Sequence, residues 1–416
     1  MTSLLLSLAL ATTAPAANPY ATEGARLTRA TIAAFYDPKA KIWRPREISS
    51  DAVGAQGYTF WPSMLAWQAI IEGAKVDPKT WKPKVGPFFE VLEQYYDRKG
   101  KAYCAWTYFP GNDDQFYDDN TWAVVACLEA FEVTGEPRYR ARAREIFEGF
   151  VRGGWDETGR LGGLRWGTKA GIEDRKDRTV SATAAGSLAA LLLAKHENLA
   201  KARTEYRAWA KRSLDWIRTK LSAPSGLIQD GIKDDGTIMT TIWTYNTGVP
   251  IRAAVEYARQ TKDASYRAWA VRMGDACLDR ELSPMFDGAV TDRTKRYWYD
   301  STYFTQYLVD GMRELSCATG DAKYVKEARR EADYARANIR DTDGLYFRNM
   351  RLWTIDAERH AAFVRLTGQT TPALAPEGSE RSLEPAVVSK PVGERPTVKT
   401  VLANGGAARM FWLLAH

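Results

Sequence analysis

The feature that most constrains the fold is a helical segment that recurs at nearly constant spacing. TGEPRYRARAREIFE from Thr134, TKDASYRAWAVRMGD from Thr261 and TGDAKYVKEARREAD from Thr319 resemble one another, and EYRAWAKRSLDWI from Glu205 is a related copy. The unit recurs every 58 to 67 residues, counted between the tyrosines at 139, 206, 266 and 324. That length holds two helices and a connection, so the repeat indicates stacked helical hairpins.

The apolar pattern agrees with this interpretation. Apolar residues follow a period of about 3.6 through most of the chain, and strand-like alternation is scarce. The pattern predicts twelve helices, with 351–365 as a candidate thirteenth, near residues 23–35, 60–72, 84–97, 119–133, 137–152, 179–195, 200–220, 243–260, 264–281, 299–317, 321–338 and 401–415. The first helix of each pair is the more apolar, as expected if it lines the inside. An open solenoid and a closed toroid both fit, but about six hairpins favour an all-α (α/α)6 barrel.

The two ends of the chain have a different character. The first residues carry a short apolar run, Leu4–Ala11, followed by small residues, which predicts a signal peptide over 1–17 and hence a secreted or periplasmic protein. The run is too short to span a membrane. Residues 18–416 are predicted to form a single catalytic domain. Within it, 368–400 contains five prolines and no clear period, which predicts an irregular loop before the last helix.

Charge and composition exclude several classes of function. The net charge of +7 is spread along the 416 residues, and the short basic runs RKGK (98–101) and RKDR (175–178) are interpreted as solvated surface. No motif typical of a nucleic-acid-binding protein accompanies them. A monomer without nucleic-acid partners is expected. The high aromatic content, 12%, suits both a packed core and a carbohydrate site.

Histidine and cysteine are scarce. The chain has three histidines, His196, His360 and His416, and neither HExxH nor CxxC occurs. A metal site built on histidine and a Ser-His-Asp triad are therefore disfavoured, and no metal or cofactor is expected. The four cysteines are even in number, so one or two disulfides remain open, and buried free thiols fit equally well: Cys104, Cys127, Cys277 and Cys317.

The stretch GNDDQFYDDNTW, residues 111–122, carries two pairs of adjacent aspartates. The first pair, Asp113 and Asp114, lies in a Gly-Asn turn and is predicted to be solvated. The second pair, Asp118 and Asp119, directly precedes a predicted apolar helix. At such a junction two carboxyl groups can face one cavity, where each raises the pKa of its neighbour. Retaining glycosidases need this combination of a proton donor and an ionised carboxylate, although simple helix capping explains the same spacing.

The chain resembles glycoside hydrolase family 76, the endo-α-1,6-mannanases. The resemblance rests on YDDNTWAVVACLEAFEVTGEPRY, GGLRWG (162–167), SATAAGSLAALLLA (181–194), GLIQDGI (226–232) and WTYNTGVPIRAAVEYARQT (243–261), in the family's order. It covers about residues 25 to 340 and implies an (α/α)6 barrel and a retaining mechanism. It further implies that Asp118 is the nucleophile and Asp119 the general acid/base.

Residues near these motifs are candidates for substrate binding. They are Tyr117, Asn120, Trp122, Trp166, Asp230, Trp243, Tyr245 and Asn246. The aromatic members suit the core equally well, Asn246 could cap its helix, and Asp230 could simply form a turn. Trp61 and Tyr303 are further candidate sugar platforms. The chain departs from the family at Gly167, where an Asn is frequent, and at YWYDSTYFTQYL (297–308), so the sugar and linkage stay open.

The sequence therefore predicts a retaining glycoside hydrolase that acts on α-mannan, most simply an endo-α-1,6-mannosidase. A cell-wall or glycan transglycosylase could use the same site. A polysaccharide lyase or epimerase usually needs a His or Tyr base, and His is scarce here. A non-catalytic carbohydrate-binding toroid is the remaining alternative, against which the intact aspartate pair argues.

Overall fold

The computed structural model describes residues 18–52, 57–169 and 171–416. The predicted signal peptide, residues 1–17, lies outside the described residues. Within them the chain forms thirteen α-helices: α1 (Pro19–Phe35), α2 (Phe60–Val76), α3 (Pro78–Leu92), α4 (Tyr117–Thr134), α5 (Pro137–Gly149), α6 (Val180–Lys195), α7 (Ala200–Lys220), α8 (Thr244–Thr261), α9 (Ala264–Leu278), α10 (Thr302–Thr319), α11 (Lys323–Asn338), α12 (Ala357–Thr367) and α13 (Val401–Leu413). All twelve predicted helices are present, and α12 corresponds to the candidate thirteenth.

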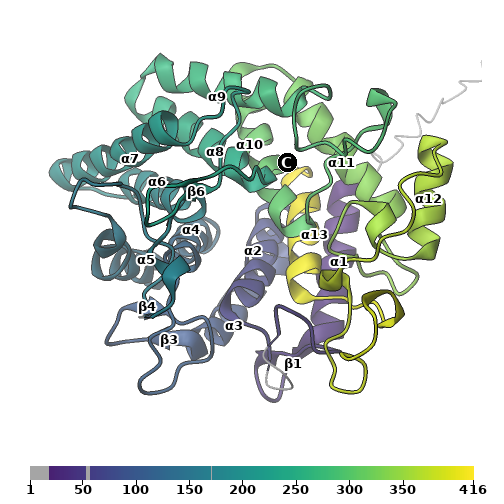
Figure 1. Cartoon of the computed structure of the whole chain (residues 1–416). Helices are drawn as coiled ribbons and strands as arrows, with labels where there is room; N and C mark the ends of the chain where they lie inside the picture. The colour runs from purple at the N-terminus through teal and green to yellow at the C-terminus, as the bar shows by residue number, and fades with distance from the viewer. Residues whose placement is uncertain (1–17, 53–56, 170) are drawn as a thin grey trace, which may run out of the picture.

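Twelve of these helices form two concentric rings (Figure 1). The inner ring runs α2, α4, α6, α8, α10 and α13, each helix contacts the next, and α13 returns to α2. The outer helices α3, α5, α7, α9 and α11 each pack on the inner helix that precedes them in the chain. The predicted (α/α)6 barrel is thus confirmed. The inner helix is the more apolar one in five of the six pairs, whereas α9 is slightly more apolar than its inner partner α8.

The ring closes through a hairpin made from both ends of the chain. The first helix, α1, lies outside and packs on the last one, α13. Trp412 of α13 lies against Gly24 of α1, and its indole Nε1 donates a hydrogen bond to Thr28 Oγ1 at 3.0 Å. This sixth hairpin is therefore a long-range contact rather than a local unit of the sequence repeat.

Small residues let the inner helices approach one another closely. A Cβ atom added to Gly248 of α8 would lie 2.4 Å from the Cα atom of Leu308 in α10, and one added to Gly311 would lie 2.3 Å from the Gly248 carbonyl oxygen. Such distances leave no room for a methyl group, so glycine is required where α8 crosses α10. The many alanines of α6, all of them buried, serve the same close packing.

Helix α3 begins six residues earlier than predicted, at Pro78. Three prolines, Pro78, Pro83 and Pro87, made the start hard to place, since proline usually interrupts a helix. Pro78 stands in the first turn, where a missing N–H costs nothing. The Asp77 side chain caps this end by accepting the Thr80 N–H at 3.2 Å.

Short strands, unpredicted because each has only two residues, brace the loops at one end of the barrel. They are β1 (Tyr36–Asp37), β2 (Ile42–Trp43), β3 (Tyr96–Asp97), β4 (Ala102–Tyr103), β5 (Arg178–Thr179), β6 (Gly231–Ile232) and β7 (Ile238–Met239). Strands β1 and β2 pair, as do β3 and β4, and β5, β6 and β7 form one antiparallel sheet. Residues 368–400 contain only two 3-10 turns, Gly378–Glu380 and Val392–Glu394, in keeping with the predicted irregular loop.

The structure shows the state of the cysteines and whether any described helix could span a membrane. All four cysteines are free thiols, and Cys104, Cys127 and Cys277 are buried. Across the described parts of the chain, no helix combines the length and apolar character that crossing a membrane requires.

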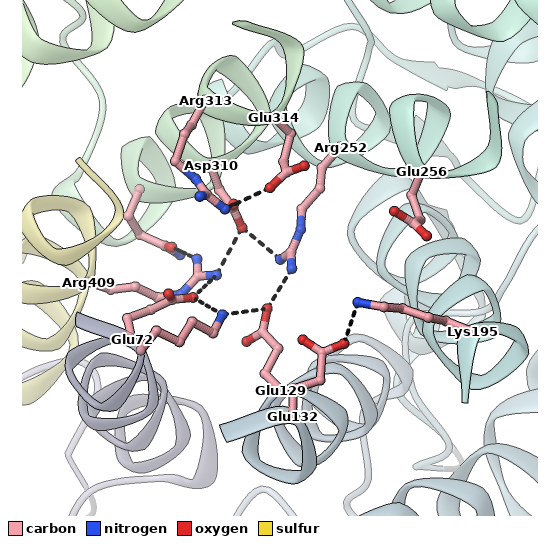
Figure 2. Close-up of polar contacts among 12 residues, drawn as sticks. Glu72, Glu129, Glu132, Lys195, Arg252, Glu256, Asp310, Arg313, Glu314 and Arg409 are labelled. Atoms are coloured by element: carbon pink, nitrogen blue, oxygen red, sulfur yellow. Dashed lines mark hydrogen bonds and ion pairs between the residues drawn. The ribbon is translucent and has the colours of Figure 1, made fainter. Parts of the chain in front are cut away.

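Charged side chains fill the barrel axis beyond the middle of the inner helices (Figure 2). Arg409 of α13 binds Asp310 of α10 at 2.9 Å and approaches Glu72 of α2 at 3.4 Å. Arg252 of α8 binds the same Asp310 at 2.7 Å and Glu129 of α4 at 2.5 Å. This axial charge network, defined by these five residues, ties five of the six inner helices together.

Candidate active site

The N-terminal ends of the inner helices converge on a pocket of about 580 Å³. Each of α2, α4, α6, α8 and α10 contributes side chains from its first two turns: Trp61, Asp118, Asp119, Trp122, Ser181, Tyr245, Phe304 and Tyr307. The connecting segments add further walls: Thr59, Ala105, Trp106, Asp114, Phe116, Trp166, Asp174, Arg175, Asp177, Thr179, Asp230 and Met239. Aromatic faces together with carboxyl groups suit a sugar, which offers apolar C–H faces and many hydroxyl groups.

Three hydrogen bonds hold the Asp118 carboxylate in place. The indole Nε1 of Trp166 donates to Oδ2 at 2.9 Å, and Ser181 Oγ donates to the same oxygen at 3.0 Å. The backbone N–H of Asp119 donates to Oδ1 at 3.0 Å. Burial raises the pKa of Asp118, and the donors from Ser181 and Trp166 oppose that rise. The donors thus favour the ionised form of Asp118, although burial outweighs them and keeps its pKa above the usual range.

The Asp119 carboxyl group has a different environment. Among the described residues, no side chain donates a hydrogen bond to it. Burial raises its pKa well above the usual range, and the nearby charges of Asp118 and Asp114 raise it further, whereas Arg175 lowers it. The pKa values of the two neighbouring carboxyl groups therefore differ, and the proton is favoured on Asp119.

Neither aspartate is a helix cap. Helix α4 begins at Tyr117, two residues earlier than predicted, and Phe116 occupies the cap position without a side-chain hydrogen bond. Asp118 and Asp119 lie in the first helical turn, where the positive end of the helix dipole favours a carboxylate. Both side chains nevertheless line the same pocket.

Four of the eight predicted binding residues line the pocket: Trp122, Trp166, Asp230 and Tyr245. The Trp122 ring stacks on Tyr307, with ring centres 4.2 Å apart. The Tyr245 hydroxyl donates to Asp230 Oδ1 at 2.7 Å, and burial raises the pKa of Asp230.

The other four are not among the residues that line the pocket. Trp243 packs on Phe304, with ring centres 5.7 Å apart, and Asn246 donates its amide to the Thr241 carbonyl oxygen at 3.2 Å. Tyr117 stacks on Phe150 with ring centres 4.6 Å apart. Asn120 is fully buried and binds the backbone of Tyr103 in β4.

The structure corrects two predictions about solvated charges. Asp114 is buried rather than solvated, because Trp106 Nε1 donates to its Oδ2 at 3.1 Å and Arg175 approaches its Oδ1 at 3.4 Å. Asp113, by contrast, is exposed as predicted. In the RKDR run, Arg178 is buried against Asp156 at 3.1 Å. The sequence does not show the loop contacts that cover these charges, so the charge run alone predicts a solvated surface.

Sequence reasoning also missed Ser181, Trp106 and Arg175 as pocket residues. Ser181 is the second residue of α6, and its place at the start of an inner helix, equivalent to that of Asp118 in α4, is the signal that could have found it. A larger groove of about 780 Å³ runs between α3 and α5 on the outside of the barrel. Some of its charges pair with one another, as in Arg142 with Glu93 and Arg138 with Glu90. The pocket at the inner ring is therefore the candidate active site.

Comparison with known proteins agrees with this geometry. The model of glycosyl hydrolase family 76 matches residues 20–332. The chain belongs to this family. Meiotically up-regulated gene 191 protein of Schizosaccharomyces pombe is 26% identical over 378 residues, which span 86% of this chain and 83% of that protein.

Solved structures of family 76 proteins share the fold at low identity. A family 76 α-mannanase of Bacteroides thetaiotaomicron superimposes with a TM-score of 0.72 at 18% identity, covering 96% of each chain. An inactive α-1,6-mannanase variant of Salegentibacter sp. HEL1_6 superimposes with a TM-score of 0.68 at 17% identity, covering 95% of this chain and 99% of that one. That variant carries asparagine in place of two consecutive aspartates and is in complex with α-1,6-mannotriose. This family 76 chain is therefore a glycoside hydrolase with α-mannanase structural neighbours.

Proposed function

We propose that this family 76 protein is a retaining endo-α-1,6-mannanase, with Asp118 as nucleophile and Asp119 as general acid/base. The observation that carries the proposal is the unequal environment of the pair: Asp118 accepts hydrogen bonds from Trp166 and Ser181, and Asp119 accepts none from the described side chains. One carboxylate stays ionised while its neighbour stays protonated, which is the state that the first step of retaining hydrolysis needs.

In the first step the Asp118 carboxylate attacks the anomeric carbon. The bond from that carbon to the glycosidic oxygen breaks, and the Asp119 proton moves to the departing oxygen. In the second step Asp119, now a carboxylate, takes a proton from water, and the resulting hydroxide attacks the anomeric carbon and releases Asp118. The neighbour in complex with α-1,6-mannotriose, inactive with two consecutive aspartates changed, supports the choice of linkage and of residues.

Linear α-1,6-mannan tests the proposal. Early products that form a ladder of oligosaccharides indicate internal cleavage, and release of mannose alone would contradict it. Proton NMR of the first product resolves its anomer: an α product indicates retention, and a β product would rule the nucleophilic role of Asp118 out. Addition of mannotriose as acceptor separates hydrolysis from glycan transfer, because transfer yields products longer than the donor.

Asp118→Asn and Asp119→Asn should each lower kcat by at least about 10³-fold on a natural mannan. Each change removes a group used in bond making or proton transfer, and the folded state should persist because asparagine keeps the size and shape of the aspartate side chain. Asp113→Asn is the matched control, since this exposed carboxylate belongs to the same stretch. Full activity in either active-site variant, or an equal loss in the control, would sink the assignment.

A further inference from the structure

Gly167 has a role that its backbone conformation does not explain. Its φ is not among the positive values that favour glycine. A Cβ atom at this position would instead lie 2.4 Å from the Cδ atom of Arg175. The side chain of Arg175 therefore passes through the space that any other residue at 167 would fill, on its way into the pocket.

Two loops hold Arg175 in that position. Its carbonyl oxygen accepts the Gly167 N–H at 3.0 Å, which ties the turn Glu173–Lys176 to the segment that follows Trp166. Its guanidinium group lies 4.0 Å from the centre of the Phe116 ring and 5.0 Å from that of Trp166. Only 13% of the side chain is exposed. A guanidinium group held close to two rings keeps a fixed position, and a flexible lysine would not reproduce this geometry.

Arg175 acts on both members of the catalytic pair. It stacks on Trp166, whose N–H positions the Asp118 carboxylate. Its charge also favours the ionised form of Asp119. The groups that act on Asp119 are Asp118 from its own helix, Asp114 from the preceding loop, Tyr307 from α10 and Arg175. Arg175 is the one cation among these described groups, so it opposes the two carboxylates.

We propose that Arg175, admitted by Gly167, is a positioning residue for the Asp118–Asp119 pair and sets the pH range in which the pair works. The inference rests on the proposed roles of the two aspartates. Because the general acid must be protonated, the upper pH limit of activity follows the proton affinity of Asp119. Loss of the Arg175 charge strengthens that affinity, so the upper limit moves to higher pH.

The test uses Arg175→Gln, Arg175→Lys and Gly167→Ala. In Arg175→Gln the alkaline limb of the pH profile of kcat/KM on α-1,6-mannan should move to higher pH by about one unit. Gly167→Ala should move it in the same direction, since the added methyl group displaces the Arg175 side chain. Arg175→Lys keeps the charge, so its alkaline limb should stay near that of the unchanged protein while kcat/KM falls. An unmoved limb in both Arg175→Gln and Gly167→Ala would overturn the inference.

Arg212→Gln is the matched control. Arg212 also lies over a tryptophan ring, 4.2 Å from the centre of Trp155, but on the outer surface, where it pairs with Glu157. Its loss should leave the pH profile unchanged. An equal shift in this control would show a general charge effect and would overturn the role of Arg175.

A second measurement does not depend on any substrate. In protein labelled with ¹³C at aspartate carboxyl carbons, the Asp119 resonance is identified by its loss in Asp119→Asn and then titrated. Its midpoint should rise in Arg175→Gln and stay unchanged in Arg212→Gln. A midpoint unchanged in Arg175→Gln overturns this inference, whatever the enzyme cleaves. Failure to cleave α-mannan with a shifted midpoint would overturn only the proposed function.

Discussion

Trp166 has two contacts that meet at the Asp118–Asp119 pair. Its indole N–H donates a hydrogen bond to Asp118, and the Arg175 guanidinium group lies over its ring. The sequence makes Trp166 a candidate sugar platform, because aromatic rings near acidic residues are typical of such sites, and equally a candidate core residue. Its hydrogen bond to Asp118 was not predictable, since it depends on how a loop packs against the first turn of α4, 48 residues earlier in the chain.

Trp166→Phe tests the hydrogen bond while keeping an aromatic ring. A hydrogen bond to a charged group contributes about 1.5–3 kcal/mol, so kcat/KM should fall about 10- to 100-fold. The pKa of Asp118 should rise because the bond favours its ionised form, and the acidic limb of the pH profile should therefore move to higher pH. Steady-state rates across pH measure both effects.

Trp216→Phe is the control for this change. Trp216 donates its indole N–H to the Leu161 carbonyl oxygen at 2.7 Å, outside the pocket. The control should lose some stability and keep its pH profile. If Trp166→Phe behaved in the same way, Trp166 would be a packing residue only.

At the scale of elements, one position recurs around the inner ring. The fourth residue of α4, α6, α8 and α13 accepts a hydrogen bond from a backbone N–H in the segment that precedes the helix. The four bonds are Tyr103 N–H to Asn120, Leu164 N–H to Thr183, Ile228 N–H to Thr247 and Tyr346 N–H to Asn404. Asn120 is thus part of a repeated brace that joins loops to inner helices. Its position beside the aspartates makes it a candidate for sugar binding. The sequence does not show that Thr183, Thr247 and Asn404 hold equivalent positions and make equivalent bonds.

Asn120→Ala and Asn404→Ala form a natural pair for testing this brace. Each amide also donates back to the braced tyrosine and to the carbonyl oxygen four residues earlier. Each change leaves buried backbone groups without partners, so each should lower the free energy of unfolding by about 3 kcal/mol in urea titrations. KM for α-mannan should respond similarly in the two variants. A KM raised only in Asn120→Ala would instead place Asn120 among the sugar contacts.

The whole molecule depends on the axial charge network as well as on apolar packing. Burial acts to raise the pKa of Asp310, but Arg252 and Arg409 outweigh it and hold that pKa below its usual range. A carboxyl group with a lowered pKa stabilises the folded state above its unfolded pKa, and this stabilisation is lost as pH falls. The barrel should therefore lose stability in acid partly through this network.

Arg409→Met should lower the free energy of unfolding at pH 7 by about 3–5 kcal/mol, since it leaves Asp310 and Glu72 with a missing partner deep in the barrel. The variant should also lose less stability than the unchanged protein as the pH falls from about 5 to about 2, because the pKa of Asp310 is then less depressed. Urea unfolding across pH measures both. Arg259→Met, which removes a half-exposed arginine paired with Glu256 and Glu314, should cost less than about 1 kcal/mol. An equal loss of unfolding free energy in the two variants would mean that burial does not make the axial charge network more important for stability than a surface ion pair.

Local patterns in the sequence determined the helices, the order of inner and outer partners and the aspartate pair. Apolar periodicity and turn residues act over a few residues, so they can be read without the fold. The tertiary structure alone decided which distant side chains meet: α1 with α13 to close the ring, Ser181 and Trp166 with Asp118, and Arg175 with the space left by Gly167. Those contacts depend on ring closure and loop packing, and no local pattern records them.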